Sequence, residues 1–231
     1  MRIGYATLPP ALGAALILAA SAALGGEMPR YEVRITNITQ GQTFTPILAV
    51  THAHDVRILE LGAAASPELE ALAEAGDTAP LSDALRALGD AVGEITTSPG
   101  LLAPGETRTI PIQPGPRARR LSLAAMLIPT NDNFVALDGA VLPRRGQQTL
   151  HLLAYDAGTE ENDQNCAHIP GPRCGGAGAS APADGDEGFV HVSRGFHELG
   201  AEDELGNEIL GPFSYDWRNP VAVVTIRRID E

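Results

Sequence analysis

Two acidic turns carry the residues of this sequence that are best suited to bind a cation. "PTNDNF" contains Asp132, and "YDAGTEEND" contains Asp156 and Glu160 among further carboxylates. Calcium takes about six to eight oxygen ligands, which are carboxylates, loop carbonyls and water. Gly158 lets the backbone curl so that Asp156 and Glu160 can converge. The turns therefore predict a calcium site built from Asp132, Asp156 and Glu160; the alternative is a pair of solvated acidic loops.

The histidines form a second set of metal-binding residues. His52 and His54 stand two positions apart in a predicted strand, where alternate side chains share a face. If the strand that carries His191 is their neighbour, the imidazoles could bind copper or zinc. The residues of this alternative metal site are His52, His54, His191 and His197. Their other interpretation is ordinary hydrogen bonding in surface or half-buried positions.

Motifs for catalysis are missing from the sequence. There is no serine nucleophile elbow, no HExxH, no phosphate-binding glycine loop and no CxxC. Nothing marks two of the many carboxylates as an acid–base pair. We therefore expect a protein that is not an enzyme. An enzyme acting on carbohydrates or esters is a lesser alternative, because a β-sandwich scaffold does not exclude one.

The charge balance limits the partners. The chain has a formal net charge of −13 at pH 7, and so acidic a surface repels nucleic-acid backbones and anionic lipid headgroups. Divalent cations and basic partners remain compatible with it. We expect a divalent cation and an extracellular protein or glycan as partners, and no nucleic acid.

The N-terminus has the pattern of a targeting signal. Arg2 precedes an apolar run over residues 11–24, and Ala20-Ser21-Ala22 fits a small-x-small cleavage site. The run is short for a membrane span, which needs ~20 residues. Residues 1–25 are therefore predicted to be a signal peptide, and residues 28–231 a single secreted or periplasmic domain with no transmembrane span. A membrane anchor is the alternative.

The two cysteines indicate a local disulfide. Cys166 and Cys174 stand eight positions apart in a glycine- and proline-rich stretch, and an exported protein can keep such a pair oxidised. The bond would pin this loop. Two free thiols or two metal ligands are the alternatives.

Short strands must position these side chains. Tyr31, Val33 and Ile35 alternate with polar residues, which is typical of a half-buried strand. "TPILAVTH" predicts a second strand, joined to the first as a hairpin through Gly41. Strands follow in "GETRTIPIQP", over residues 121–128 and 134–141, in "QQTLHLLAYDAGTEEND" where the strand runs into the acidic loop, at the start of "GFVHVSRGFHELG", and in the closing "NPVAVVTIRRIDE".

Two helices interrupt the strands. In "SPELEALAEAG", Ser66 suits the N-cap and Gly76 the position after the helix. "LSDALRALG" predicts a second helix capped by Ser82. We expect an all-β fold, an antiparallel β-sandwich of about eight strands, with this short helical insertion lying over one end of the sheet.

The paired turns resemble the signature of the spondin domain, the N-terminal domain of F-spondin and mindin. That family reads roughly P-S-P-D-W-F-x-G-x-D and then Y/W-D-A-G-T-D. Pro129, Asp132, Phe134 and Asp138 match the first motif, and residues 155–159 match the second. The opening strands and the helical section resemble bacterial members. The resemblance implies an eight-stranded sandwich with one calcium ion, and the matching ligands are Asp132, Asp156 and Glu160.

Two positions depart from the family pattern. Asn133 stands where the family has Trp, which implies weaker apolar shielding beside the site. Glu160 stands where the family has Asp, so the site must widen or Glu160 must bind through both oxygens. These departures bear on affinity for calcium. The thrombospondin-type repeats of the animal proteins have no counterpart in this sequence, so roles that depend on them do not transfer.

Overall fold

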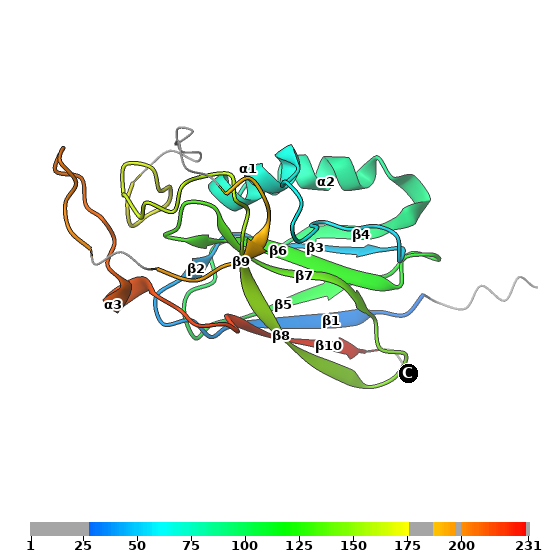
Figure 1. Ribbon diagram of the computed structural model, residues 1–231. Helices are drawn as coiled ribbons and strands as arrows, with labels where there is room; N and C mark the ends of the chain where they lie inside the picture. The colour runs from blue at the N-terminus through cyan, green and yellow to red at the C-terminus, as the bar shows by residue number, and fades with distance from the viewer. Residues whose placement is uncertain (1–27, 176–186, 197–199, 230–231) are drawn as a thin grey trace, which may run out of the picture.

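An antiparallel sheet curls into two facing layers, as the computed structural model shows (Figure 1). The structure describes residues 28–175, 187–196 and 200–229, so the predicted signal peptide lies outside the described residues. The main path of the sheet runs β4 (Val92–Thr97), β3 (Leu48–His52), β6 (Arg120–Ile128), β7 (Asn133–Val141), β8 (Gln147–Asp156), β10 (Ala222–Arg228), β1 (Tyr31–Asn37) and β5 (Thr107–Ile112). Two short strands, β2 (Thr43–Phe44) and β9 (His191–Val192), pair with β6 and β8. The prediction of an all-β antiparallel fold is confirmed.

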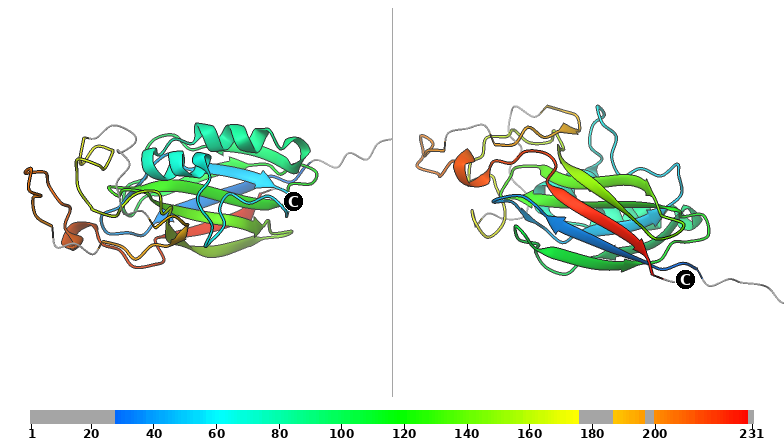
Figure 2. Two further views of the ribbon diagram at one scale, coloured as in Figure 1. Left: turned by 45° about the horizontal axis from the view of Figure 1, so that its top comes forward. Right: turned by 90° about the horizontal axis from the view of Figure 1, so that it is seen from below.

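The main core fills the space between the layers. Strands β3, β4, β6 and β7 form one layer, and β8, β10, β1 and β5 form the other (Figures 1 and 2). Strand β5 also contacts β3 and β4, which nearly closes the sandwich. Alternate residues of β1 point into this core: Val33 and Ile35 are 0% exposed and Tyr31 is 3% exposed. This burial confirms the period-two pattern of that segment.

The strand pairing differs from the predicted hairpin. Strand β1 lies between β10 and β5, whereas β3 lies between β4 and β6. The expected pairing of β1 with β3 through Gly41 is therefore wrong. Consecutive strands often pair, but here the hydrogen bonds of β1 go to strands much later in the chain.

Two helices, α1 (Pro67–Ala75) and α2 (Ala79–Arg86), enter the chain between β3 and β4. The hydroxyl of Ser66 accepts a hydrogen bond from the Leu69 N–H at 3.3 Å, and Gly76 takes the left-handed conformation at φ 67°. The predicted caps of α1 are therefore confirmed. Helix α2 begins before Ser82, which is buried inside it, because Pro80 suits the first turn.

The helices cover a face of the sheet rather than one end of it. Leu69 and Leu72 of α1 pack into a second apolar cluster with Val50 of β3 and Phe134 of β7. Figure 2 shows α1 and α2 lying along the β3–β4 side of the sandwich. The predicted position over a sheet end is wrong because the apolar stripe of α1 is satisfied by the outer face of β3, β6 and β7.

Long connections gather at one end of the sandwich (Figure 1). A one-turn 3-10 helix (Gly89–Ala91) leads into β4, and the short helix α3 (Pro212–Tyr215) precedes β10.

The predicted disulfide is confirmed: Cys166 and Cys174 are bonded, with their Cα atoms 4.9 Å apart. No described helix has the length and apolar character needed to cross a membrane.

Candidate metal site

The register of three neighbouring strands builds the site. Asn133 at the start of β7 pairs with Asp156 at the end of β8, and Asp156 pairs with His191 at the start of β9. Asp132 immediately precedes β7. The turn between β6 and β7 and the loop after β8 therefore meet at one end of the sandwich, as the order of the strands requires.

Asp132 is a fully buried carboxylate that organises the loop after β8. Its Oδ2 accepts hydrogen bonds from the Thr159 N–H at 2.8 Å, the Thr159 hydroxyl at 3.3 Å and the Glu160 N–H at 3.2 Å. Its backbone carbonyl accepts the Ala157 N–H at 3.2 Å. The other carboxylate oxygen, Oδ1, is buried and has no hydrogen-bond partner among the described residues. An acceptor in that position is suited to ligate a cation.

Asp156 is held in place by its own loop. Its Oδ1 accepts the Gly158 N–H at 2.9 Å, and its Oδ2 accepts the Asn162 amide at 2.8 Å. The Asn133 amide donates to the side-chain oxygen of Asn162 at 2.9 Å. At the position where the family pattern has Trp, this chain therefore places a buried amide that helps to orient the Asp156 carboxylate.

Burial makes ionisation of both aspartates unfavourable. The pKa of the Asp132 carboxyl is raised to about 8, first by the loss of water on burial and next by the charge of Asp156. The N–H groups of Thr159 and Glu160 oppose this shift, because their hydrogen bonds favour the ionised form. Burial also raises the pKa of Asp156, and the hydrogen bond from Asn162 opposes the rise. A bound cation would supply the missing positive charge.

Glu160 belongs to the same loop and is 2% exposed. It joins Asp132 through its backbone N–H. The predicted ligands Asp132, Asp156 and Glu160 are thus all buried on the two turns. In the described part of the chain, however, these three residues together do not form a group of His, Cys, Asp or Glu side chains whose ligand atoms all lie within 4.8 Å of one another. Joint coordination of one ion would therefore draw these side chains closer together.

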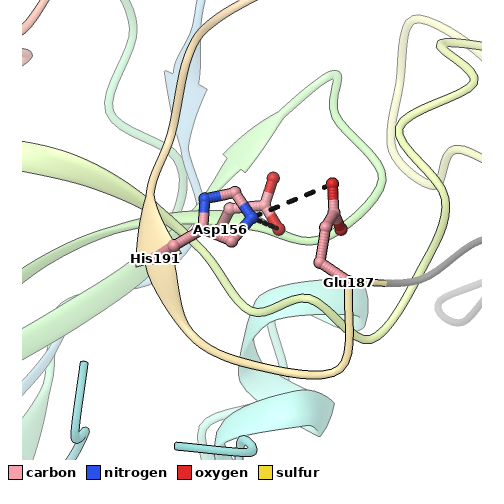
Figure 3. Close-up of side chains that lie close together, drawn as sticks. All are labelled: Asp156, Glu187 and His191. Carbon is pink, nitrogen blue, oxygen red and sulfur yellow. Dashed lines mark ion pairs between the residues drawn. The ribbon is translucent and has the colours of Figure 1, made fainter. Parts of the chain in front are cut away.

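In the described residues, one group of three candidate metal ligands has its ligand atoms within 4.8 Å of one another, and it consists of Asp156, Glu187 and His191 (Figure 3). His191 Nε2 lies 3.5 Å from Asp156 Oδ1 and 3.8 Å from Glu187 Oε1. Sequence reasoning assigned His191 to a separate histidine site and did not consider Glu187. The Glu-x-x-x-His spacing was visible, but the pairing of β9 with β8 was not.

The other predicted histidine ligands lie elsewhere. His52 is fully buried in β3, and its ring nitrogens lie 2.7 Å from the Ala53 carbonyl and 2.7 Å from the Ser122 hydroxyl. Burial lowers its pKa. His54 follows the end of β3 and has an exposed side chain, so the two do not alternate within one strand. His197 lies outside the described residues. The structure does not bring His52 or His54 together with His191 as a metal-binding group within the described ranges.

Gly158 is the residue on which the loop geometry depends most. It has φ +65°, and a Cβ there would lie 2.4 Å from the Phe189 carbonyl oxygen and 2.8 Å from the Phe189 nitrogen. This close approach explains a glycine between Asp156 and Glu160. It also packs the segment before β9 against the loop after β8.

Gly158→Ala is expected to destabilise the protein by about 3 kcal/mol, from overpacking against backbone and from left-handed strain. Gly146→Ala is the matched control, because Gly146 has φ +66° and open space around its Cβ position. For Gly146→Ala, left-handed strain alone predicts that the free energy of unfolding falls by about 1 kcal/mol. Urea unfolding of both variants measures the difference, and equal losses would show that the contact with Phe189 is unimportant.

The family model Spondin_N matches residues 35–168, which is more than half of the chain and includes both acidic turns. The chain belongs to the spondin N-terminal domain family. A comparison with curated proteins gave no match. Within this spondin domain, Asp132, Asp156 and Glu160 lie inside the matched residues, whereas Glu187 and His191 follow them.

Proposed function

We propose that this spondin domain is a secreted or periplasmic calcium-binding module with a binding or adhesive role, and that it is not an enzyme. The observation that carries the proposal is Asp132: its carboxylate is fully buried, beside Asp156, and Oδ1 lacks a hydrogen-bond partner in the described chain. A hard divalent cation offers what such a carboxylate needs.

In this proposal, calcium is held by the carboxylates of Asp132, Asp156 and Glu160. Its contribution is charge neutralisation and cross-linking of the turn before β7 to the loop after β8. The protein groups already present orient these ligands: the Thr159 N–H holds Asp132, and Asn162 holds Asp156. A locked loop cluster at one end of the sandwich would present a fixed surface to an extracellular protein or glycan.

An exported location is supported by the disulfide, because such bonds persist in oxidising compartments. The disulfide lies in the connection that follows the acidic loop, and the Cys166 N–H donates to the Glu208 carbonyl at 2.8 Å. It therefore fastens the same end of the molecule that carries the proposed calcium site.

Thermal unfolding with and without calcium tests the proposal. At calcium concentrations about ten to a hundred times Kd, binding to the folded state adds about 1.4–2.7 kcal/mol. For a domain of this size that raises Tm by roughly 3–10 °C. Magnesium at the same concentration is the control for ionic strength. Equal Tm values in millimolar calcium and in chelator would contradict a calcium site.

A further inference from the structure

Glu187 and His191, which the calcium proposal does not use, form a cluster with Asp156, which it does use. Their ligand atoms come from three places: the end of β8, the segment before β9, and β9 itself (Figure 3). Glu187 and His191 also lie beyond residues 35–168, where the family match ends. Two of the three ligand residues therefore lie outside the part of the chain that the family model matches, and Asp156 lies inside it.

The imidazole of His191 has the arrangement of a metal ligand. Its Nδ1 lies 3.2 Å from the Val192 carbonyl, so that Nδ1 carries the proton and Nε2 has the free lone pair in the neutral ring. The Nε2 atom is buried and makes no hydrogen bond to any described residue. This nitrogen points toward both carboxylates, as Figure 3 shows.

The distances suit a small divalent ion. In a tetrahedral site with bonds of ~2.1 Å, neighbouring ligand atoms stand ~3.4 Å apart. His191 Nε2 lies 3.5 Å from Asp156 Oδ1 and 3.8 Å from Glu187 Oε1. Small side-chain shifts would therefore bring all three atoms onto one ion, and a water molecule could complete the coordination.

The surroundings add a second reason for positive charge at this place. Glu187 Oε2 is buried and has no hydrogen-bond partner in the described ranges, and the same is true of Asp132 Oδ1. The charges of Asp156 and Glu187 both act on Asp132. One protonated imidazole would balance only one of these carboxylates, whereas a divalent ion would balance two.

We propose that Asp156, Glu187 and His191 bind a divalent transition metal of the zinc class. The nitrogen ligand distinguishes this position from a calcium site, because calcium takes oxygen ligands and zinc takes imidazole readily. The proposal shares Asp156 with the proposed calcium site but does not depend on calcium binding. Two variants separate the sites: His191→Gln for zinc and Glu160→Gln for calcium.

The test is a zinc titration of the full-length, metal-stripped protein against a competing chromophoric chelator. Wild type is expected to bind one zinc ion with micromolar or tighter affinity. His191→Gln and Glu187→Gln should each weaken binding at least ~10-fold, as loss of a ligand requires. His54→Gln is the matched control, since the side chain of His54 is exposed, and its affinity should equal that of wild type.

Calcium titrations of the same proteins distinguish the two proposals. His191→Gln should bind calcium within ~2-fold of wild type, because calcium gains little from imidazole nitrogen. Glu160→Gln should lose calcium affinity and keep zinc affinity. Zinc binding without calcium binding would overturn only the calcium proposal.

The zinc proposal is overturned if wild type binds no zinc at micromolar concentration. It is also overturned if both His191→Gln and Glu187→Gln bind zinc as wild type does. Melting curves in metal-free buffer show whether each variant is folded, and the use of two ligand variants keeps the test decisive if one of them is not.

Discussion

Asp132→Asn is expected to abolish the rise in Tm that calcium produces and to raise the Tm of the calcium-free protein at pH 8. The substitution keeps the shape of the side chain and removes its charge. The amide oxygen can still accept the N–H groups of Thr159 and Glu160, which now bond to Oδ2. The amide nitrogen would take the place of Oδ1, the buried oxygen that has no partner within the described structure.

The higher Tm expected for calcium-free Asp132→Asn follows from the burial of Asp132 beside Asp156. Replacing the carboxylate by an amide removes the cost of ionising a buried acid and the repulsion between the two charges. The loss of the calcium response follows because a neutral amide is a weaker ligand for a hard cation. Differential scanning calorimetry with and without calcium measures both effects.

Glu161→Gln is the matched control for this experiment. Glu161 lies in the same loop, is exposed, and is assigned no part in the site. The substitution Glu161→Gln removes one negative charge from the same region of the chain, so a general effect of net charge on Tm would appear in both variants. A calcium response that survives in Asp132→Asn would place the ion elsewhere.

The calcium-free protein is expected to lose stability as pH rises from about 7 to about 9. The folded pKa of Asp132 is about 8, above its ordinary value of 3.8. A carboxyl with a raised folded pKa stabilises the folded state while it is protonated, and this contribution is lost as pH rises through the folded pKa. Over these two pH units the loss for one such group is about 1.4 kcal/mol.

His52 determines the choice of pH range. Burial lowers the pKa of His52. The neutral imidazole therefore contributes folding stability that is lost as pH falls below the ordinary histidine pKa of about 6.5, whereas the contribution of Asp132 is lost as pH rises. Above pH 7 the contribution of His52 changes by only about 0.2 kcal/mol. Urea unfolding in chelator at several pH values should therefore show the slope of Asp132. Asp132→Asn should have a flatter profile, and an equally steep one would assign the slope to another group.

Local features of the fold could be predicted from sequence, and long-range pairing could not. The alternation of Tyr31, Val33 and Ile35 records which side of β1 is buried, and Ser66 and Gly76 mark α1 through its caps. The partners of β1 are β10 and β5, far along the chain. No local pattern in β1 specifies them, because alternation fixes the buried face but not the neighbouring strand.

The same limit applies to the site. Asp132 and Asp156 could be identified because both follow predicted strands and because the pair matches a family signature. His191 was predicted as a copper or zinc ligand, but in a site with other histidines rather than beside Asp156. Its position beside Asp156 depends on β9, a strand of two residues whose pairing with β8 places them opposite each other. Such short strands carry too little sequence pattern to be assigned a partner.

Isothermal titration of calcium into the chelator-stripped wild-type protein tests the central claim most directly. We predict binding of one calcium ion per chain, and no measurable binding to Asp132→Asn under the same conditions. Absence of heat and of bound calcium for the wild type at millimolar concentration, with the protein folded, would contradict it.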